Sequence, residues 1–158
     1  MMQPQKGPYG HSIMIGLLQR VSEASVSVGG EKVASIGRGL LVLIAVQPGD
    51  SEASTRRMVE RLFGYRVFAD EHGRMNRSLD DLGHELLLVP QFTLAADTDK
   101  GTRASFTSAA SPENGRRYFE LLLEICRQRS PRVQSGIFAA DMQVALVNDG
   151  PVTFWLEA

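Results

Sequence analysis

Leu40–Val46 reads LLVLIAV and contains no polar side chain. A strand with one face in water alternates polar and apolar residues, whereas a strand that is apolar throughout has both faces covered. The run therefore predicts a central strand buried on both sides. Glu85–Val89 is a second strongly apolar segment and predicts a similar strand.

Outward from these segments, shorter strands and two helices are predicted. Asp50 or Ser51 opens the first helix and Ser111-Pro112 opens the second, since Ser and Asp cap helices and Pro suits a first turn. The expected buried stripes are Ala53, Met58, Val59, Leu62 and Phe63 in the first helix, and Tyr118, Leu121, Leu122, Ile125 and Cys126 in the second. The other expected strands are Ile15–Val21, Ala24–Val28, Lys32–Ile36, Tyr65–Phe68, Val133–Ile137, Met142–Val147 and Val152–Leu156. This order predicts a single α/β domain with a mixed sheet and two main helices.

Composition excludes several classes of protein. The chain has 158 residues, a net charge of −1 and one cysteine, Cys126. A net charge this close to zero gives no general attraction to nucleic acid or membrane. A single cysteine cannot form an internal disulfide, and it suits a reducing compartment. No apolar run reaches the roughly 18 residues of a membrane span. Residues 1–13 lack any pattern, so we expect a disordered extension, a cloning remnant or a wrongly assigned start, with the domain at residues 14–158.

The usual catalytic motifs are missing. No P-loop or G-x-S-x-G motif occurs, and no His, Cys, Asp and Glu cluster has metal-ligand spacing, so no metal site is predicted. His11, His72 and His84 are interpreted as surface or structural histidines, since none is near another candidate group in the sequence.

Two short stretches stand out instead. Gln91-Phe92-Thr93-Leu94 follows the second apolar strand, and Asn148–Thr153 reads NDGPVT between two predicted strands. Pro90 removes one strand hydrogen-bond donor, and the Phe92 N–H at a distorted strand end could stabilise an oxyanion. X-Pro bonds adopt the cis form at modest cost. Together the two stretches predict a pocket that is formed by backbone groups and that distinguishes the two enantiomers of a substrate.

Thr93 is the one hydroxyl that could act as a nucleophile. A threonine nucleophile needs a base within hydrogen-bond reach, and the sequence offers none nearby. The alternative is an ordinary strand threonine.

Four basic residues lie on or after the loop that follows Gln91. Such side chains can bind phosphates by charge-assisted hydrogen bonds, and a plain solvated face is the alternative. They are Lys100, Arg103, Arg116 and Arg117.

These stretches, in this order, resemble the D-aminoacyl-tRNA deacylases from residue 14 to residue 158. The resemblance rests on Gln19-Arg20-Val21 with Ala24-Ser25-Val26, Gly39–Val46, Gly64–Phe68, Gln91–Ala95, Lys100-Gly101 with Arg103 and Ser105-Phe106, Phe138–Met142, and Asn148–Thr153.

The resemblance implies a homodimeric β/β/α layered fold with each active site at the dimer interface. Gly150-Pro151 of one subunit enters the other subunit's pocket as a cis peptide, which excludes L-aminoacyl groups and admits D-aminoacyl groups and glycine. The expected reaction hydrolyses the ester of D-aminoacyl-tRNA, and of glycyl-tRNA mischarged on tRNA-Ala, as translational proofreading in the cytoplasm. The 2′-hydroxyl of the terminal adenosine takes the place of a protein base, and no cofactor is needed. The expected partners are aminoacyl-tRNA and a second copy of the chain, with no DNA and no membrane.

The same resemblance assigns residues. Phe92 supplies the oxyanion amide, Gln91 and Thr93 line the pocket, and Arg20 and Met142 hold the Gly-Pro loop. An older proposal for the family makes the threonine a nucleophile.

Two positions depart from the family pattern. Pro90 stands where Ser is usual, and Ala104 stands where Pro is usual. Pro at the first position occurs in a related subfamily that has a trans Gly-Pro and clears L-alanyl-tRNA. Relaxed chirality toward L-alanyl-tRNA is therefore one alternative, and a protein that binds the tRNA end without turnover is another.

Overall fold

The computed structural model describes residues 13–107 and 109–158. The extension expected at residues 1–13 lies outside these ranges except for Ile13, whose carbonyl accepts a hydrogen bond from the Gln47 side chain at 2.9 Å. Met14 is fully buried, and its N–H donates to the Asp50 carboxylate at 2.8 Å. These hydrogen bonds fix the start of the first strand to the segment around Gln47 and Asp50.

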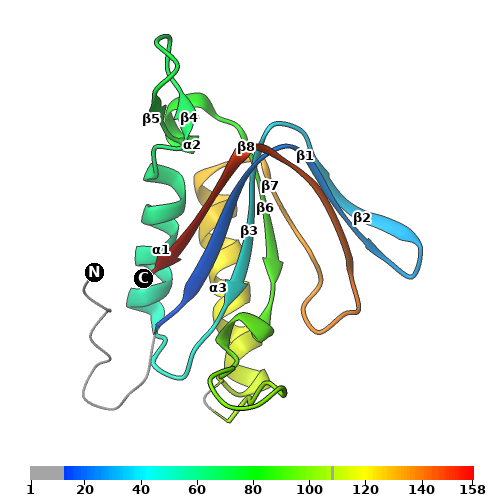
Figure 1. Cartoon of the computed structure of the whole chain (residues 1–158). Coiled ribbons are helices and arrows are strands. Elements are labelled where there is room, and N and C mark those ends of the chain that lie inside the picture. Colours follow the sequence, from blue (N-terminus) through cyan, green and yellow to red (C-terminus); the bar gives the residue numbers. More distant parts are fainter. Residues whose placement is uncertain (1–12, 108) are drawn as a thin grey trace.

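A mixed sheet organises the chain (Figure 1). It consists of β1 (Ile15–Val28), β2 (Glu31–Ile36), β3 (Gly39–Ala45), β6 (Glu85–Pro90), β7 (Val133–Ser135) and β8 (Gln143–Glu157). The order is β2-β1-β3-β6-β7, and β8 also pairs with β1. Pairs β3–β6 and β6–β7 are parallel, and the pairs made by β1 are antiparallel. The predicted mixed sheet is confirmed.

Within the residues that the structure describes, three helices and a 3-10 turn complete the fold. They are α1 (Glu52–Gly64), α2 (Leu79–Leu82), α3 (Pro112–Arg129) and the turn η1 (Phe92–Ala95). The Ser51 and Ser111 side chains cap α1 and α3 as predicted, each accepting a backbone N–H of the first turn. None of the helices in the described ranges has the length and apolarity needed to cross a membrane.

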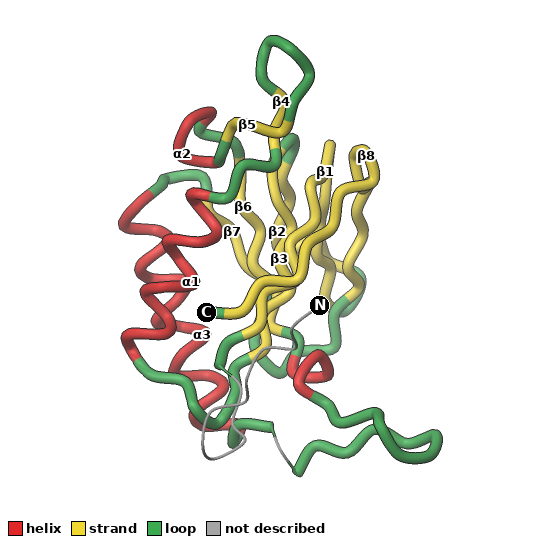
Figure 2. The backbone as a smooth tube through the Cα atoms, turned by 60° about the vertical axis from the view of Figure 1, so that its left-hand side comes forward, coloured by secondary structure: helices red, strands yellow, loops and turns green. Residues whose placement is uncertain are grey.

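Both faces of β3 and β6 are covered, which explains the uninterrupted apolar run. Leu40, Val42 and Ile44 join a core with residues of α1 and α3. Leu41, between them in sequence, joins a second core with Val26 of β1 and other residues of the curled β1–β2 part. Figure 2 shows the helices on one side of the strands. The predicted central strand and layered β/β/α arrangement are thereby confirmed.

Several predicted boundaries were wrong. The two strands expected within residues 15–28 are one strand, because register shifts near Val21 bend it without a turn. The strands expected on either side of Asn148–Pro151 are likewise one strand, β8. Of Tyr65–Phe68 only Phe68 is in a strand. Two short elements, β5 (Met75–Arg77) and α2, were not predicted, because segments of so few residues show no periodicity.

The buried stripes of the helices also differ slightly from the prediction. In α1, Ala53 is exposed, and Thr55 is buried with its hydroxyl donating to the Ser51 carbonyl at 2.8 Å. In α3, Phe119 is buried, whereas Tyr118 at the edge of the stripe is only half-buried. Leu122 and Cys126 are buried as predicted, and Phe119 is the buried residue that the predicted stripe omitted.

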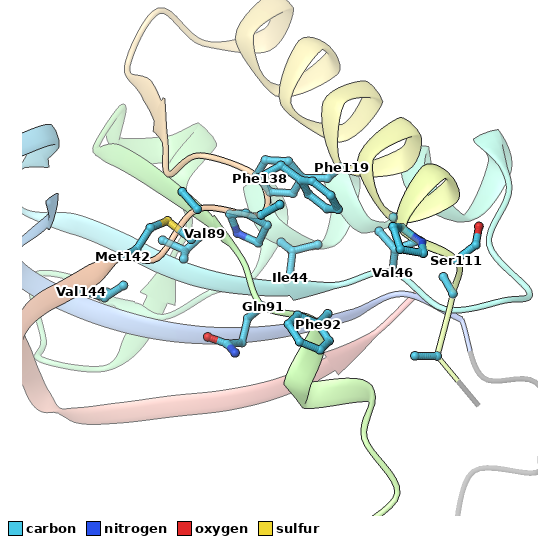
Figure 3. A pocket seen from close by; sticks show the side chains of 17 residues that line it. Ile44, Val46, Val89, Gln91, Phe92, Ser111, Phe119, Phe138, Met142 and Val144 are labelled. Atoms are coloured by element: carbon cyan, nitrogen blue, oxygen red, sulfur yellow. The ribbon is translucent and has the colours of Figure 1, made fainter. Parts of the chain in front are cut away.

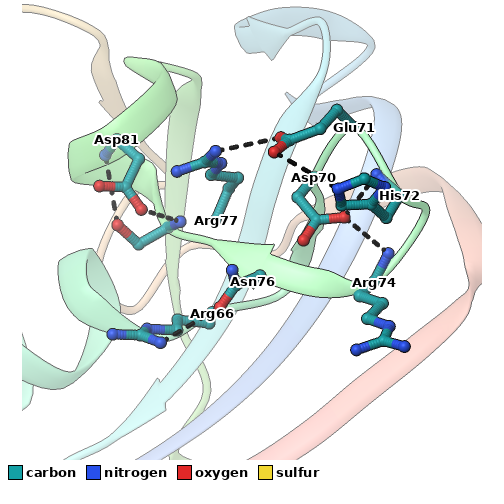
Figure 4. Close-up of polar contacts among 9 residues, drawn as sticks. Arg66, Asp70, Glu71, His72, Arg74, Asn76, Arg77 and Asp81 are labelled. Atoms are coloured by element: carbon teal, nitrogen blue, oxygen red, sulfur yellow. Dashed lines mark hydrogen bonds and ion pairs between the residues drawn. The ribbon is translucent and has the colours of Figure 1, made fainter.

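The hairpin of β4 (Phe68–Ala69) and β5 projects from one end of the molecule and is held by polar contacts (Figure 4). The Asp70 carboxylate accepts the N–H groups of Arg74 and His72, at 3.0 and 2.8 Å. These hydrogen bonds, led by that of Arg74, keep the pKa of Asp70 below its usual value. Arg77 donates to Glu71 at 3.1 Å across the hairpin. These polar contacts hold the β4–β5 hairpin in place, although the hairpin has no hydrophobic core of its own.

Candidate functional site

A cavity of about 420 Å³ opens where β3 and β6 end (Figure 3). Its walls come from the strand ends, from η1, from the start of α3 and from the segment before β8. The lining residues are Ile44, Val46, Val89, Pro90, Gln91, Phe92, Ala109, Ala110, Ser111, Pro112, Gly115, Phe119, Phe138, Ala139, Ala140, Met142 and Val144. A concave, mostly apolar pocket with few polar groups is typical of a small-molecule site.

The lining residues of the cavity carry no ionisable side chain, and Gln91 and Ser111 are the polar ones. The Ser111 hydroxyl accepts the Asn114 N–H at 3.2 Å as the α3 cap. Cys126 lies in the core, where burial raises the pKa of its thiol to about 12. Neither residue is therefore an activated nucleophile, and the lining residues that the structure describes supply no general base.

Phe92 is the first residue of η1 and is separated from β6 by Gln91. The Gln91 N–H still completes the sheet by donating to the Ile44 carbonyl at 2.8 Å. The Phe92 N–H comes next, and the first N–H groups of a helical turn have no acceptor within it. The chain thus leaves the sheet at the cavity wall, where Phe92 is one of the lining residues.

Gln91 and Thr93 are placed differently from each other. Gln91 lines the cavity, but Thr93 is exposed and is not among the lining residues. The Gln91 side-chain amide donates to the Thr93 hydroxyl, and in Figure 3 it points away from Phe138 and Phe119. In this chain Thr93 orients Gln91 and does not face the cavity.

Pro90 and Met142 meet in the cavity wall around Gly136. A Cβ added to Gly136 would lie 2.7 Å from the Met142 sulfur and 3.5 Å from the Pro90 ring. The Met142 sulfur also accepts the Ile137 N–H at 3.4 Å. A side chain at position 136 would displace the Met142 side chain, and the contacts make Pro90 and Met142 part of one surface.

Asn148–Thr153 forms a bulge in β8. One residue, Arg20, separates Gln19 and Val21 on β1, whereas four residues, 149 to 152, separate their β8 partners Asn148 and Thr153. The Asn148 side chain closes the bulge, accepting the Val152 N–H at 2.7 Å and donating to the Thr153 hydroxyl at 2.9 Å. Such bulges re-aim the backbone of a strand.

Arg20 supports this bulge from β1. Its Nε donates to the Asp149 carbonyl at 2.9 Å, and its Nη1 donates to the Val67 carbonyl at 2.7 Å. Gly150 and Pro151 are exposed, and the bond between them is cis. A Cβ on Gly150 would lie 3.0 Å from Arg20 Nη2. Arg20 therefore contacts the loop as expected, whereas Met142 of the same chain lies in the cavity wall.

Within one chain the bulge is not part of the cavity lining. Pro90 pairs with Ile44, which pairs with Gly16, whereas the bulge lies opposite Arg20 on β1. Val144, on the same strand as the bulge, lines the cavity, but Gly150 and Pro151 do not.

The four basic residues do not form one cluster. Lys100 and Arg103 lie on a short hairpin closed by mutual hydrogen bonds between Asp97 and Ser105, each 2.8 Å. Arg116 lies over the Phe138 ring, 4.8 Å from its centroid, and so stands at the cavity rim. Arg117 packs on Tyr118.

Phe119, Phe138 and Ala139 were not predicted as site residues from the sequence. Phe138 and Phe119 are neighbouring aromatic walls, with ring centroids 6.4 Å apart. Ala139 adopts φ 65°, a left-handed conformation that is uncommon for a residue with a Cβ. The Phe138–Met142 stretch in the family resemblance was the available signal for the segment.

Comparisons with known proteins agree with this geometry. The family model described as D-Tyr-tRNA(Tyr) deacylase matches residues 17–157. A D-aminoacyl-tRNA deacylase of Alkalilimnicola ehrlichii is 64% identical over 92% of this chain and 97% of its own length. A D-aminoacyl-tRNA deacylase of Escherichia coli is 52% identical over 91% of this chain and 99% of its own.

Two solved structures are similar. One is described as a c-Myc DNA unwinding element binding protein, with a TM-score of 0.87 and 38% identity over 91% of this chain and 98% of that one. The other is described as a probable eukaryotic D-amino acid tRNA deacylase, with a TM-score of 0.80 and 19% identity over 92% of this chain and 99% of that one. The second similarity concerns the fold alone.

Proposed function

The chain belongs to the D-Tyr-tRNA(Tyr) deacylase family, and we propose that it hydrolyses the ester of D-aminoacyl-tRNA. The products are the free D-amino acid and tRNA, so the reaction removes wrongly charged tRNA before protein synthesis uses it. Glycyl-tRNA mischarged on tRNA-Ala is a second proposed substrate, since glycine has no side chain to exclude.

The proposed chemistry uses the Phe92 backbone amide. Water attacks the ester carbonyl carbon, and the Phe92 N–H stabilises the negative charge that develops on the carbonyl oxygen. The bond between the carbonyl carbon and the ribose oxygen then breaks, one proton of the attacking water passes to that ribose oxygen, which leaves as a hydroxyl, and the amino acid leaves with a free carboxyl group. Because the described residues that line the cavity carry no ionisable side chain, the neighbouring 2′-hydroxyl of the substrate is proposed to assist the water.

Chirality is assigned to Gly150-Pro151. We propose that this bulge enters the cavity of a partner subunit and that its carbonyl groups occupy the space of an L side chain. An L-aminoacyl group would then clash, whereas a D-aminoacyl group points its side chain elsewhere. The support is the exposure of Gly150 and Pro151 and their absence from the cavity lining of their own chain.

The partner proposed for this arrangement is a second copy of the chain. In the described ranges β8 pairs with β1 alone, so its outer edge is open along a strand of 15 residues. Its outward-facing residues include Val147 and Trp155, which are 49% and 51% exposed. A long open edge with exposed apolar side chains favours association.

Mixing two inactive variants tests the shared site. Ala140→Trp would fill the cavity and Gly150→Ala would alter the bulge. A mixed dimer has one intact site, so a 1:1 mixture should recover about a quarter of the wild-type sites. No recovery after subunit exchange, with mixed dimers demonstrated by mass, would contradict a site shared between subunits.

The observation that carries the proposed function is the position of Phe92, which lines the cavity and opens η1, where the first N–H groups have no acceptor within the turn. Phe92→Pro removes this donor at the first position of a helical turn, where proline is tolerated. The value of kcat for D-Tyr-tRNA should fall by about 100- to 1,000-fold. Phe92→Ala is the control, because it keeps the N–H and should keep most of kcat at saturating substrate. Equal kcat values for the two variants would refute the oxyanion role.

Pro90 supports a second candidate specificity. Its ring lines the cavity beside Met142, so the pocket that this chain presents differs from one with serine there. Purified protein should deacylate D-Tyr-tRNA and leave L-Tyr-tRNA intact. Hydrolysis of L-Ala-tRNA as well would assign relaxed chirality, and binding of tRNA with no turnover would assign a binding role.

A cytoplasmic location is proposed because aminoacyl-tRNA is used there.

A further inference from the structure

Two phenylalanine side chains stand together on the surface beside the cavity. Phe92 is 62% exposed and Phe106 is 42% exposed. Their ring centroids are 5.1 Å apart with a tilt of 51°. Exposed aromatic pairs are costly to keep in water and often mark a binding surface.

The pair continues the cavity outward. Phe92 lines the cavity, and Phe106, which does not, contacts the Phe92 ring from outside. If the terminal unit of a linear polymer occupies the cavity, the unit that adjoins it in the polymer would therefore lie over this aromatic pair. In the proposed substrate, that next unit is the single-stranded nucleotide on the 5′ side of the acylated adenosine.

The loop around the pair suits a nucleic-acid strand. Residues 97–105 form a hairpin whose base is closed by the Asp97–Ser105 hydrogen bonds. The Asp97 carboxylate, which is exposed, accepts the Asp99 N–H at 2.9 Å. Lys100 and Arg103 are exposed on this hairpin and make no ion pair within the described ranges. Stacking on aromatic rings beside cationic side chains is how proteins bind single strands without reading their sequence.

We infer that Phe92 and Phe106 form a second nucleotide subsite, which stacks the base that precedes the acylated adenosine. This inference rests on the proposed function and extends it from the ester to the end of the RNA. It predicts that part of the affinity for tRNA comes from a nucleotide that takes no part in the reaction.

Substrates of increasing length test the subsite. Phe106→Leu keeps an apolar side chain and removes the aromatic face, whereas Phe106→Tyr keeps the ring. One stacked base contributes about 1–3 kcal/mol, so kcat/KM for D-tyrosyl-CpA and D-Tyr-tRNA should fall at least about fivefold in Phe106→Leu. Hydrolysis of D-tyrosyl-adenosine, which lacks the preceding nucleotide, should change less than twofold, and Phe106→Tyr should match the wild type throughout.

Three outcomes would overturn the subsite. An equal loss with D-tyrosyl-adenosine would mean that Phe106 acts only by shaping the cavity. Unchanged kinetics with every substrate would mean that no base stacks there. A change in oligomeric mass, measured by sedimentation, would assign the aromatic pair to contacts between copies of the chain.

A binding measurement separates this inference from the proposed function. The non-acylated trinucleotide CCA is prepared with fluorescent 2-aminopurine in place of the middle base. Stacking should quench its fluorescence on wild-type protein and on Phe106→Tyr, and less on Phe106→Leu. If the protein hydrolyses no ester but this pattern holds, the subsite stands and the proposed reaction fails. Hydrolysis without quenching would support the reaction and overturn the subsite.

Discussion

Gly150 lies in a bulge that leaves no room for a side chain. Its φ is +140°, and an added Cβ would lie 2.8 Å from Val152 Cγ2 and 3.0 Å from Arg20 Nη2. Glycine is the residue that tolerates such backbone freely. Arg20 and Asn148 then fix the loop by hydrogen bonds to its backbone, so its shape is set by residues outside the Gly-Pro pair.

Gly150→Ala should therefore abolish most activity without unfolding the protein. A displacement of the loop by about 1 Å can lower kcat/KM by about 100-fold. Gly73→Ala is a matched control, since Gly73 has φ +78° and no atom near the added Cβ. Both variants should unfold cooperatively in thermal unfolding, with the larger loss of stability in Gly150→Ala, but Gly150→Ala alone should lose D-Tyr-tRNA hydrolysis. Normal hydrolysis by Gly150→Ala would count strongly against the chirality model.

Thr93 presents the opposite case, a candidate nucleophile that the structure places outside the cavity. Its hydroxyl accepts from the Gln91 amide, and no ionisable side chain lines the cavity beside it. Thr93→Ala should keep kcat within about tenfold of wild type, since the loss is one neutral hydrogen bond of about 1 kcal/mol. Complete loss of turnover, with tRNA binding and fold intact, would restore the nucleophile hypothesis.

At the scale of elements, β3 and β6 position the site because they are held in tight register. Gly39 begins β3 opposite Glu85, and a Cβ at Gly39 would lie 1.9 Å from the Glu85 carbonyl oxygen. That contact is with backbone, which cannot rotate away. The close approach at one end of the strand pair sets where Ile44 and Pro90 end at the other.

Gly39→Ala should be among the most destabilising single changes, by more than about 4 kcal/mol, or should prevent folding. Gly64→Ala is the comparison, because its Cβ would meet nothing at the end of α1 and should raise stability by about 0.5–1 kcal/mol. Urea unfolding followed by circular dichroism measures both. A small effect of Gly39→Ala would show that the β3–β6 register can shift.

At the scale of the whole molecule, the net charge of −1 gives no general attraction to RNA. Binding of tRNA must then depend on local cations near the cavity. Lys100 and Arg103 stand on the hairpin beside the aromatic pair, and Arg116 stands at the rim over Phe138. The long-range field of the protein contributes little, so contacts with individual phosphates dominate.

Affinity for tRNA should therefore fall as salt concentration rises, with a linear plot of log K against log salt concentration. Changing Lys100 and Arg103 to Gln should reduce the slope by about one for each phosphate that the variant no longer binds. Arg57→Gln, on the exposed face of α1, is the control and should leave the slope unchanged. A flat salt response of the wild-type protein would remove the phosphate role of these residues.

Sequence alone determined the elements that carry a strong local signal. Leu40–Val46 was predicted as a doubly covered strand because its lack of polar residues has one structural explanation, and Ser51 and Ser111 were predicted as caps because capping is local chemistry. The family resemblance was readable for the same reason, since its motifs are contiguous.

Tertiary structure decided what depends on residues distant in the chain. Periodicity could not place Thr93 outside the cavity, since only the 3-10 turn after β6 turns it outward. It could not bring Phe138 and Phe119 together in one wall or Phe106 against Phe92, since these pairs form through packing between separate elements. Nor could it place the Gly150 bulge outside the cavity lining of the same chain. That placement follows from the strand order, which is set by pairing across the whole sheet and not by any one segment.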